Sequence, residues 1–157
     1  MINYIEGDLF ANLDKSKKIC MPHVCNCLGK MGSGFVIPLA KHFPKAKEEY
    51  LNLGKWELGT TQFVNNGFIT VANMIAQTLG GSERPLFYNY LVKCMEQVTE
   101  YCHLNMAEIV CPLFGSGLAK GDPDFIEELM IDCWIKRDIS VTVYYLKDFL
   151  PKGWSPK

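Results

Sequence analysis

The sequence has almost no net charge, because 16 lysine and arginine residues face 17 aspartate and glutamate residues, for a formal charge of −1. The basic residues are scattered, apart from a small group at Lys15, Lys17 and Lys18. Nucleic acids and anionic membranes bind proteins through concentrated positive surfaces. We therefore expect neither a nucleic-acid polymer nor a membrane as a partner of this chain.

The sequence also lacks a signal-peptide pattern and any long apolar run. Its cysteines are odd in number and fall mostly inside apolar segments, at positions 20, 25, 27, 94, 102, 111 and 133. A free thiol in such a segment behaves as a small hydrophobic group, which favours a reducing cytoplasm. Cys25 and Cys27 have no second cysteine or histidine pair at a ligand spacing, so we expect no zinc site and no cofactor.

No internal repeat, linker or low-complexity segment divides the chain. With 157 residues, 48% of them hydrophobic, it can bury one core. We therefore expect a single monomeric domain over residues 1–157, with a core at 2–146 and a C-terminal tail at 147–157.

Hydrophobic spacing predicts alternating strands and helices. Strands are expected at 2–7, 19–27, 60–64, 68–76, 108–114 and 139–146, and the fourth follows a hairpin turn at Asn65-Asn66-Gly67. Helices are expected at 35–43, 45–53 and 85–105, and from Asp122-Pro123 with Phe125, Leu129 and Cys133 facing inward. This order predicts a three-layer α/β/α sandwich around a mixed, mostly parallel sheet.

Two predicted junctions between a strand and a helix are rich in glycine: CNCLGKMGSG at 25–34 and FGSGLAKG at 114–121. A third loop opens at Gly80-Gly81-Ser82. In open α/β sheets ligands bind beyond the carboxyl ends of the strands, where consecutive backbone N–H groups can hold an anion. The two loops are thus either a cradle for an anion, which we favour, or ordinary tight turns. Neither matches the dinucleotide or P-loop patterns, which disfavours a Rossmann dehydrogenase and a P-loop ATPase.

Four stretches of the chain follow one another in a characteristic order: GDLF at 7–10, CNC to MGSG at 25–34, FGSGL at 114–118 and VYYL at 143–146. Together they resemble the macrodomain family, which binds ADP-ribose, over about residues 2–146. The first loop is most similar to that of the fungal ADP-ribose 1″-phosphate phosphatases and of the terminal glycohydrolases that remove ADP-ribose from glutamate.

The resemblance implies a role for each matching residue. Asp8 would accept a hydrogen bond from the adenine amine beside Leu9, although a turn cap is an equal alternative for its carboxylate. The distal ribose would lie on Asn26 and the first loop, and the diphosphate on the amides of the second. The ligand-binding residues implied in this way are Asp8, Leu9, Asn26, Met31, Gly32, Ser33, Gly34, Gly115, Ser116, Gly117, Leu118, Ala119, Tyr144 and Leu146.

The chain departs from the glutamate-directed glycohydrolases at two positions. Their attacking lysine is matched by Gln77 or Thr78, and their acid after the second loop by Ala119. Neither a glutamine nor an alanine can form a Schiff base or transfer a proton. Asp122 is better explained as a helix cap before Pro123. These two differences make the glutamate-directed activity the least favoured of the hypotheses.

His23 is the remaining group that can exchange protons near neutral pH, and it stands where both related branches place histidine. We expect it to be catalytic, with a buried structural histidine as the alternative. His42 and His103 are expected to be structural or exposed, and Trp154 is expected to cover a patch of the core or of a crystal neighbour. The sequence thus predicts a metal-independent hydrolase of ADP-ribose 1″-phosphate; the alternatives are a module that binds ADP-ribose, free or on a protein, and a glutamate-directed hydrolase.

Overall fold

The computed structural model describes residues 1–79 and 83–156, so the predicted Gly80-Gly81-Ser82 loop lies outside the described residues. Its centre is one six-stranded sheet with the order β1-β6-β5-β2-β4-β3. Neighbouring strands are parallel except for the β3–β4 hairpin. The strands are β1 (Asn3–Glu6), β2 (Ile19–Asn26), β3 (Thr61–Asn66), β4 (Ile69–Gln77), β5 (Glu108–Pro112) and β6 (Val141–Tyr145).

Burial agrees with the places of β2 and β4 inside the sheet, where each has a neighbouring strand on both sides. Almost every residue of these two strands is buried, as expected for strands covered on both faces. The predicted Asn-Gly turn between β3 and β4 is present, with Gly67 at φ 72°. The strand order and the hairpin confirm the mixed, mostly parallel sheet.

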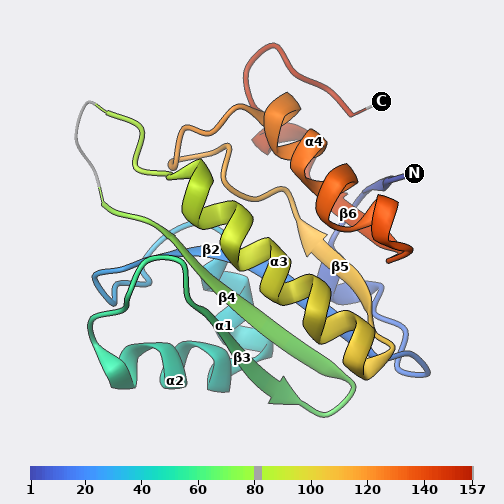
Figure 1. Ribbon diagram of the computed structural model, residues 1–157, viewed down its shortest axis with the longest axis horizontal. Helices are drawn as coiled ribbons and strands as arrows, with labels where there is room; N and C mark the ends of the chain where they lie inside the picture. The colour runs from blue at the N-terminus through green and yellow to red at the C-terminus, as the bar shows by residue number, and fades with distance from the viewer. Residues whose placement is uncertain (80–82, 157) are drawn as a thin grey trace.

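Helices cover both faces of the sheet (Figure 1). One face carries α1 (Val36–His42) and α2 (Pro44–Leu53), and the other carries α3 (Tyr88–Asn105) and α4 (Pro123–Cys133). Pro38 lies in the first turn of α1, where no helical N–H is required, and Gly54 ends α2 at φ 78°. These three layers are the sandwich that the sequence predicted.

The start of α3 differs from the prediction by three residues. Leu86 forms a bridge with Gln77, and the N–H of Phe87 donates to Ala76 O at 2.9 Å. These contacts keep residues 85–87 extended beside the end of β4. The helix can therefore begin only at Tyr88.

The inward face of α4 was also predicted incorrectly in part. Phe125 is 43% exposed and its ring packs edge-on against Tyr88, with the centroids 4.6 Å apart. Burial falls instead on Ile126, Met130 and Cys133, which are spaced by four and three residues. The face was misassigned because Phe125 and Ile126 are adjacent apolar residues and only the packing partner decides between them.

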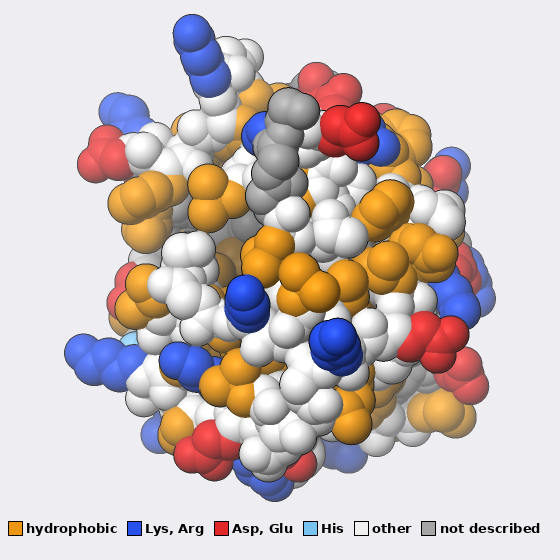
Figure 2. All heavy atoms as spheres, turned by 90° about the vertical axis from the view of Figure 1, so that its left-hand side faces the viewer, with side chains coloured by type: hydrophobic (Ala, Val, Ile, Leu, Met, Phe, Trp, Pro, Cys, Tyr) orange, Lys and Arg blue, Asp and Glu red, His pale blue; other side chains and the backbone are white. Residues whose placement is uncertain are grey.

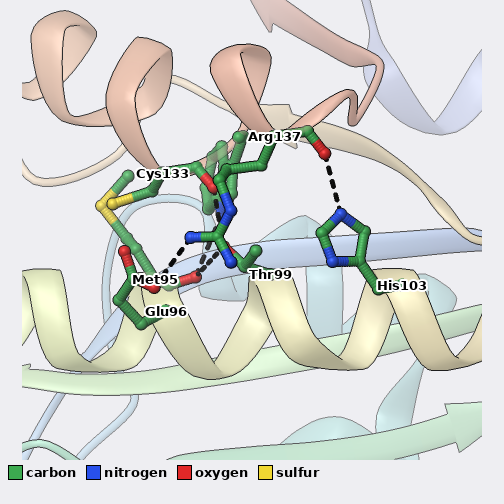
Figure 3. Close-up of polar contacts among 7 residues, drawn as sticks. Met95, Glu96, Thr99, His103, Cys133 and Arg137 are labelled. Atoms are coloured by element: carbon green, nitrogen blue, oxygen red, sulfur yellow. Dashed lines mark hydrogen bonds and ion pairs between the residues drawn. The ribbon is translucent and has the colours of Figure 1, made fainter.

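Polar contacts tie α4 and the turn that follows it to α3 (Figure 3). Thr99 Oγ1 donates to Cys133 O at 2.8 Å, and Arg137 Nη1 lies 3.3 Å from Glu96 Oε2. His103 Nε2 donates to Arg137 O at 2.8 Å. His103 therefore has the structural role that was expected for it.

The C-terminal tail folds back on the first strand. Trp154 Nε1 donates to Asp124 Oδ1 at 2.8 Å, and its ring lies edge-on to Tyr4 at 6.0 Å between centroids. Trp154 thus covers part of the core, as expected. None of the helices within residues 1–79 and 83–156 is long and apolar enough to cross a membrane.

Candidate functional site

A cavity of about 650 Å³ lies at the carboxyl ends of β2, β4 and β5, between the two glycine-rich loops. The parallel strands bring these loops together, because the carboxyl ends of such strands meet at one edge of the sheet. A smaller hollow of about 420 Å³ lies between β3 and α3 and contains none of the predicted site residues. The larger cavity is therefore the candidate site.

Most of the predicted site residues line this cavity. Those that line it are His23, Asn26, Met31, Gly32, Ser33, Gly34, Gly115, Gly117, Leu118 and Ala119. Those outside its lining are Asp8, Leu9, Ser116, Tyr144 and Leu146. Except for Ser116, which belongs to the second loop, the outlying residues follow or end β1 and β6, on the same edge of the sheet.

The side chain of Asn26 shapes the first loop. Its Oδ1 accepts from the N–H of Leu28 at 3.1 Å and of Lys30 at 3.2 Å, and its Nδ2 donates to Lys30 O at 2.5 Å. The buried Tyr50 hydroxyl donates to the carbonyl of Asn26. Asn26 thus braces the turn that presents the rest of the loop to the cavity, and its contact with a ribose stays a prediction.

The glycines of the first loop serve two purposes. Gly29 has φ 74°, and a Cβ atom there would lie 1.6 Å from Gly54 O, so this glycine permits close packing of the loop against the end of α2. A Cβ at Gly32 would meet nothing within 4 Å. The loop is therefore tightly packed at Gly29 and open at Gly32.

The second loop is closed by its own backbone. The N–H of Gly121 donates to Gly115 O at 2.8 Å, and that of Lys120 donates to Gly117 O at 3.0 Å. These two bonds hold residues 115–121 in a compact turn after β5. The closure fixes the direction of the backbone groups between its ends.

Backbone N–H groups in both loops are available to a ligand. Among the described residues, the N–H groups of Met31 to Gly34 and of Ser116 to Leu118 have no hydrogen-bond partner. Consecutive unpaired N–H groups form concave sites for anions. The arrangement can therefore bind an anionic ligand along the cavity, which agrees with the cradle rather than with ordinary turns.

His23 lies on β2 and is only 2% exposed. Its Nε2 donates to Oδ1 of Asn73 at 2.5 Å, and Asn73 pairs with it in register on β4. Asn73 Nδ2 in turn donates to Ala46 O at 3.2 Å and to Gln62 Oε1 at 3.0 Å. Because both donors of Asn73 are engaged, its oxygen faces the histidine, and the neutral ring of His23 carries its proton on Nε2.

Burial lowers the pKa of His23 from 6.5 to about 4, against the opposite effect of the Asn73 hydrogen bond. The ring is thus neutral at pH 7, with Nδ1 as the acceptor. These contacts are those of a histidine held in the core, and a catalytic role for it stays a prediction. Asn73 was not among the predicted site residues, although a single amide inside the apolar strand ITVANMIA was a usable signal.

Asp8 follows β1 and is exposed. Its Oδ1 accepts from the N–H of Phe10 at 3.0 Å and caps a short 3-10 helix, Leu9–Ala11. The turn cap that was considered as an alternative is therefore present. Only one carboxylate oxygen is used in this way, and a contact of the other with adenine stays a prediction.

The cavity also contains residues that were not predicted as ligands. Gln77 and Phe35 line it, and so do Lys30 and Lys120, which lie within the two glycine-rich loops. Their position inside those loops was the signal that could have identified the lysines. Among the described residues, no group of three His, Cys, Asp or Glu side chains could hold a metal ion.

Comparisons with known proteins identify the fold family. No family model matches the chain. An uncharacterized 17.5 kDa protein of enterobacteria phage T4 is 32% identical over 141 residues, which cover 83% of this chain and 88% of that protein. The solved structure of a macrodomain protein from Streptomyces coelicolor is 32% identical with a TM-score of 0.79, over 92% of this chain and 98% of that one. The chain belongs to the macrodomain family.

A shorter similarity links part of the macrodomain to a fungal enzyme. An ADP-ribose 1″-phosphate phosphatase of Candida albicans is 43% identical over 51 residues. The match covers 32% of this chain and 33% of the fungal protein. The similarity therefore spans about a third of that enzyme's length.

Proposed function

We propose that this macrodomain binds ADP-ribose in the cavity and hydrolyses ADP-ribose 1″-phosphate to ADP-ribose and inorganic phosphate. The observation that carries the proposal is the pair of loops with unpaired N–H groups on one cavity. The partial similarity to a fungal phosphatase of this substrate supports the choice of reaction.

The ligand would lie along the carboxyl edge of the sheet. Its diphosphate would accept hydrogen bonds from the amides of Ser116 to Leu118, and its distal ribose would contact the loop from Met31 to Gly34. The adenine would extend toward Asp8, beyond the end of β1. Backbone dipoles would meet the charge of the diphosphate, so that its binding requires no metal.

In the proposed reaction a water oxygen attacks the phosphorus, and the bond between phosphorus and the 1″ oxygen breaks. The 1″ oxygen takes up a proton that the water has given up and leaves with ADP-ribose as a hydroxyl group, and the phosphate leaves with the water oxygen. His23 Nδ1 would orient the water or accept its proton. Since a base with a pKa of about 4 is weak, most of the rate would come from placement of the reactants and from amides that face the developing charge.

The glutamate-directed reaction has less support. The cavity is lined by Gln77 and Thr78, either of which matches the attacking lysine of those glycohydrolases, and by Ala119, which matches their acid. None of these side chains can form the Schiff base or supply the proton. This favours the phosphatase reaction over removal of ADP-ribose from glutamate.

Two assays on the purified chain test the proposal. Calorimetry should show that ADP-ribose binds much more tightly than AMP, because only ADP-ribose presents a distal ribose and a second phosphate to the loops. Phosphate should be released from ADP-ribose 1″-phosphate. Equal affinities would show that the loops are plain turns, whereas binding without phosphate release would indicate a non-catalytic module.

A further inference from the structure

The charges that line the cavity are all of one sign. Among its described lining residues, Lys30 and Lys120 are the only ones with ionised side chains at neutral pH, and no aspartate or glutamate belongs to the lining. Each lysine comes from a different glycine-rich loop. Figure 2, which faces this edge of the sheet, shows basic side chains both near the middle and toward the outline, and acidic ones toward the outline.

The first of these lysines is held in place by its backbone. The N–H and the carbonyl of Lys30 are both hydrogen-bonded to the side chain of Asn26, at 3.2 and 2.5 Å. The side chain of Lys30 is exposed, and its ammonium group has no partner among the described residues. A flexible cation is thus anchored at the start of the open part of the first loop.

The second lysine occupies a backbone conformation that suits glycine. Lys120 has φ 61°, in the left-handed region that side chains with a Cβ rarely adopt. A glycine would take this conformation without strain. A strained residue next to a binding cavity suggests that its side chain has a use.

We infer that Lys30 and Lys120 determine specificity by holding the terminal phosphate of the ligand. The inference rests on the proposed function, in which the loop amides already meet the charge of the diphosphate. A 1″-phosphate adds almost two further negative charges at pH 7. Two ammonium groups from opposite loops, with no carboxylate among the described lining residues, complement that group and favour the phosphorylated ligand over ADP-ribose.

The test compares two ligands across matched variants. ADP-ribose affinity is measured by calorimetry. For ADP-ribose 1″-phosphate, kcat/KM is measured if the wild type releases phosphate, and affinity if it does not. Lys30→Gln and Lys120→Gln should each weaken recognition of the phosphorylated ligand about tenfold, as expected for loss of one charged contact, and change ADP-ribose affinity less than about threefold.

Charge and position have separate controls. Lys30→Arg and Lys120→Arg retain the cation and should keep most of the preference. Lys15→Gln removes the same charge near the amino end of β2, on the opposite edge of the sheet. This variant should recognise both ligands like the wild type. Lys120→Gly should lose the preference for the phosphorylated ligand. Its melting temperature should stay constant or rise, because glycine adopts the left-handed backbone conformation without strain.

The outcomes separate this inference from the proposed function. If the wild type releases no phosphate but binds the phosphorylated ligand more tightly, and Lys30→Gln and Lys120→Gln lose this preference, the phosphatase proposal fails and the proposed clamp formed by Lys30 and Lys120 stands. If phosphate is released and the double Lys30→Gln, Lys120→Gln variant keeps the wild-type preference, the clamp is wrong and the phosphatase proposal stands. A wild type that does not prefer the phosphorylated ligand also overturns the clamp.

Discussion

One carboxylate oxygen of Asp8 caps the helix Leu9–Ala11, and the other is proposed to contact adenine. Replacing it with alanine would remove both interactions at once. Asp8→Asn separates them, because an asparagine oxygen still accepts from Phe10 N but the side chain no longer carries a charge. We expect Asp8→Asn to keep the wild-type melting temperature and to weaken ADP-ribose binding by roughly 1–3 kcal/mol in calorimetry.

Asp8→Ala provides the comparison. It should weaken binding to a similar extent and also lower stability by about 1 kcal/mol through loss of the cap. If both variants bind ADP-ribose like the wild type, Asp8 is only a cap and has no place in the site.

The burial of His23 makes stability depend on pH. Its pKa is about 4 in the folded chain and 6.5 in the unfolded one, so between these values the unfolded chain binds a proton that the folded chain does not. Stability is therefore complete above pH 6.5 and falls as the pH is lowered toward 4. This group alone should lower the free energy of unfolding by roughly 2 kcal/mol between about pH 7 and pH 5.

Urea unfolding at a series of pH values measures this effect. His23→Gln should lose this part of the pH dependence, although the variant is less stable overall. If the free energy of unfolding depends on pH equally in wild type and variant, the pKa of His23 is the same in the folded and the unfolded chain.

At the scale of single elements, each glycine-rich loop contains both tightly packed and open glycines. A Cβ at Gly117 would meet nothing within 4 Å, so valine can be accommodated there. The same side chain would stand on the cavity edge and keep a phosphate away from the loop amides. Gly117→Val should remain folded by circular dichroism and lose ADP-ribose binding by about a hundredfold or more. A folded variant with normal affinity would place the diphosphate elsewhere.

Gly29→Ala is expected to behave in the opposite way. Its new Cβ would collide with Gly54 O in a left-handed backbone, so the melting temperature should fall sharply. A stable Gly29→Ala protein would show that the contact between the first loop and the end of α2 is not required.

The elements that the sequence predicted well have local causes. The Asn-Gly turn at Gly67 and the cap at Asp122-Pro123 depend on residues within a few positions of one another. The face of α4 and the start of α3 depend on distant partners, such as Tyr88 and the end of β4, and were predicted less accurately. The bond between His23 and Asn73 also joins two strands, so neither residue alone revealed it.

At the scale of the whole molecule, the sheet order explains how distant loops form one site. The loops at 25–34 and 114–121 are far apart in the chain, yet they follow β2 and β5, which are parallel neighbours. Glycine content alone predicted two loops of a similar kind, but strand pairing decides that they face one cavity. The two lysines became recognisable as a pair only when these loops were placed together.

The C-terminal tail lies outside this site and is expected to affect stability alone. Trp154 packs against Tyr4 and donates to Asp124, and it does not line the cavity. Trp154→Ala removes a hydrogen bond worth about 1 kcal/mol and an aromatic contact of similar size. The melting temperature should fall by about 4–8 °C, as measured by calorimetric unfolding.

Trp154→Phe keeps a ring near Tyr4 and loses only the hydrogen bond to Asp124. Its melting temperature should therefore fall about half as far as that of Trp154→Ala. Both variants should bind ADP-ribose with wild-type affinity. If either variant binds more weakly while it is fully folded, the tail takes part in ligand binding. If neither variant changes the melting temperature, the contacts of Trp154 with Tyr4 and Asp124 do not hold the tail in solution.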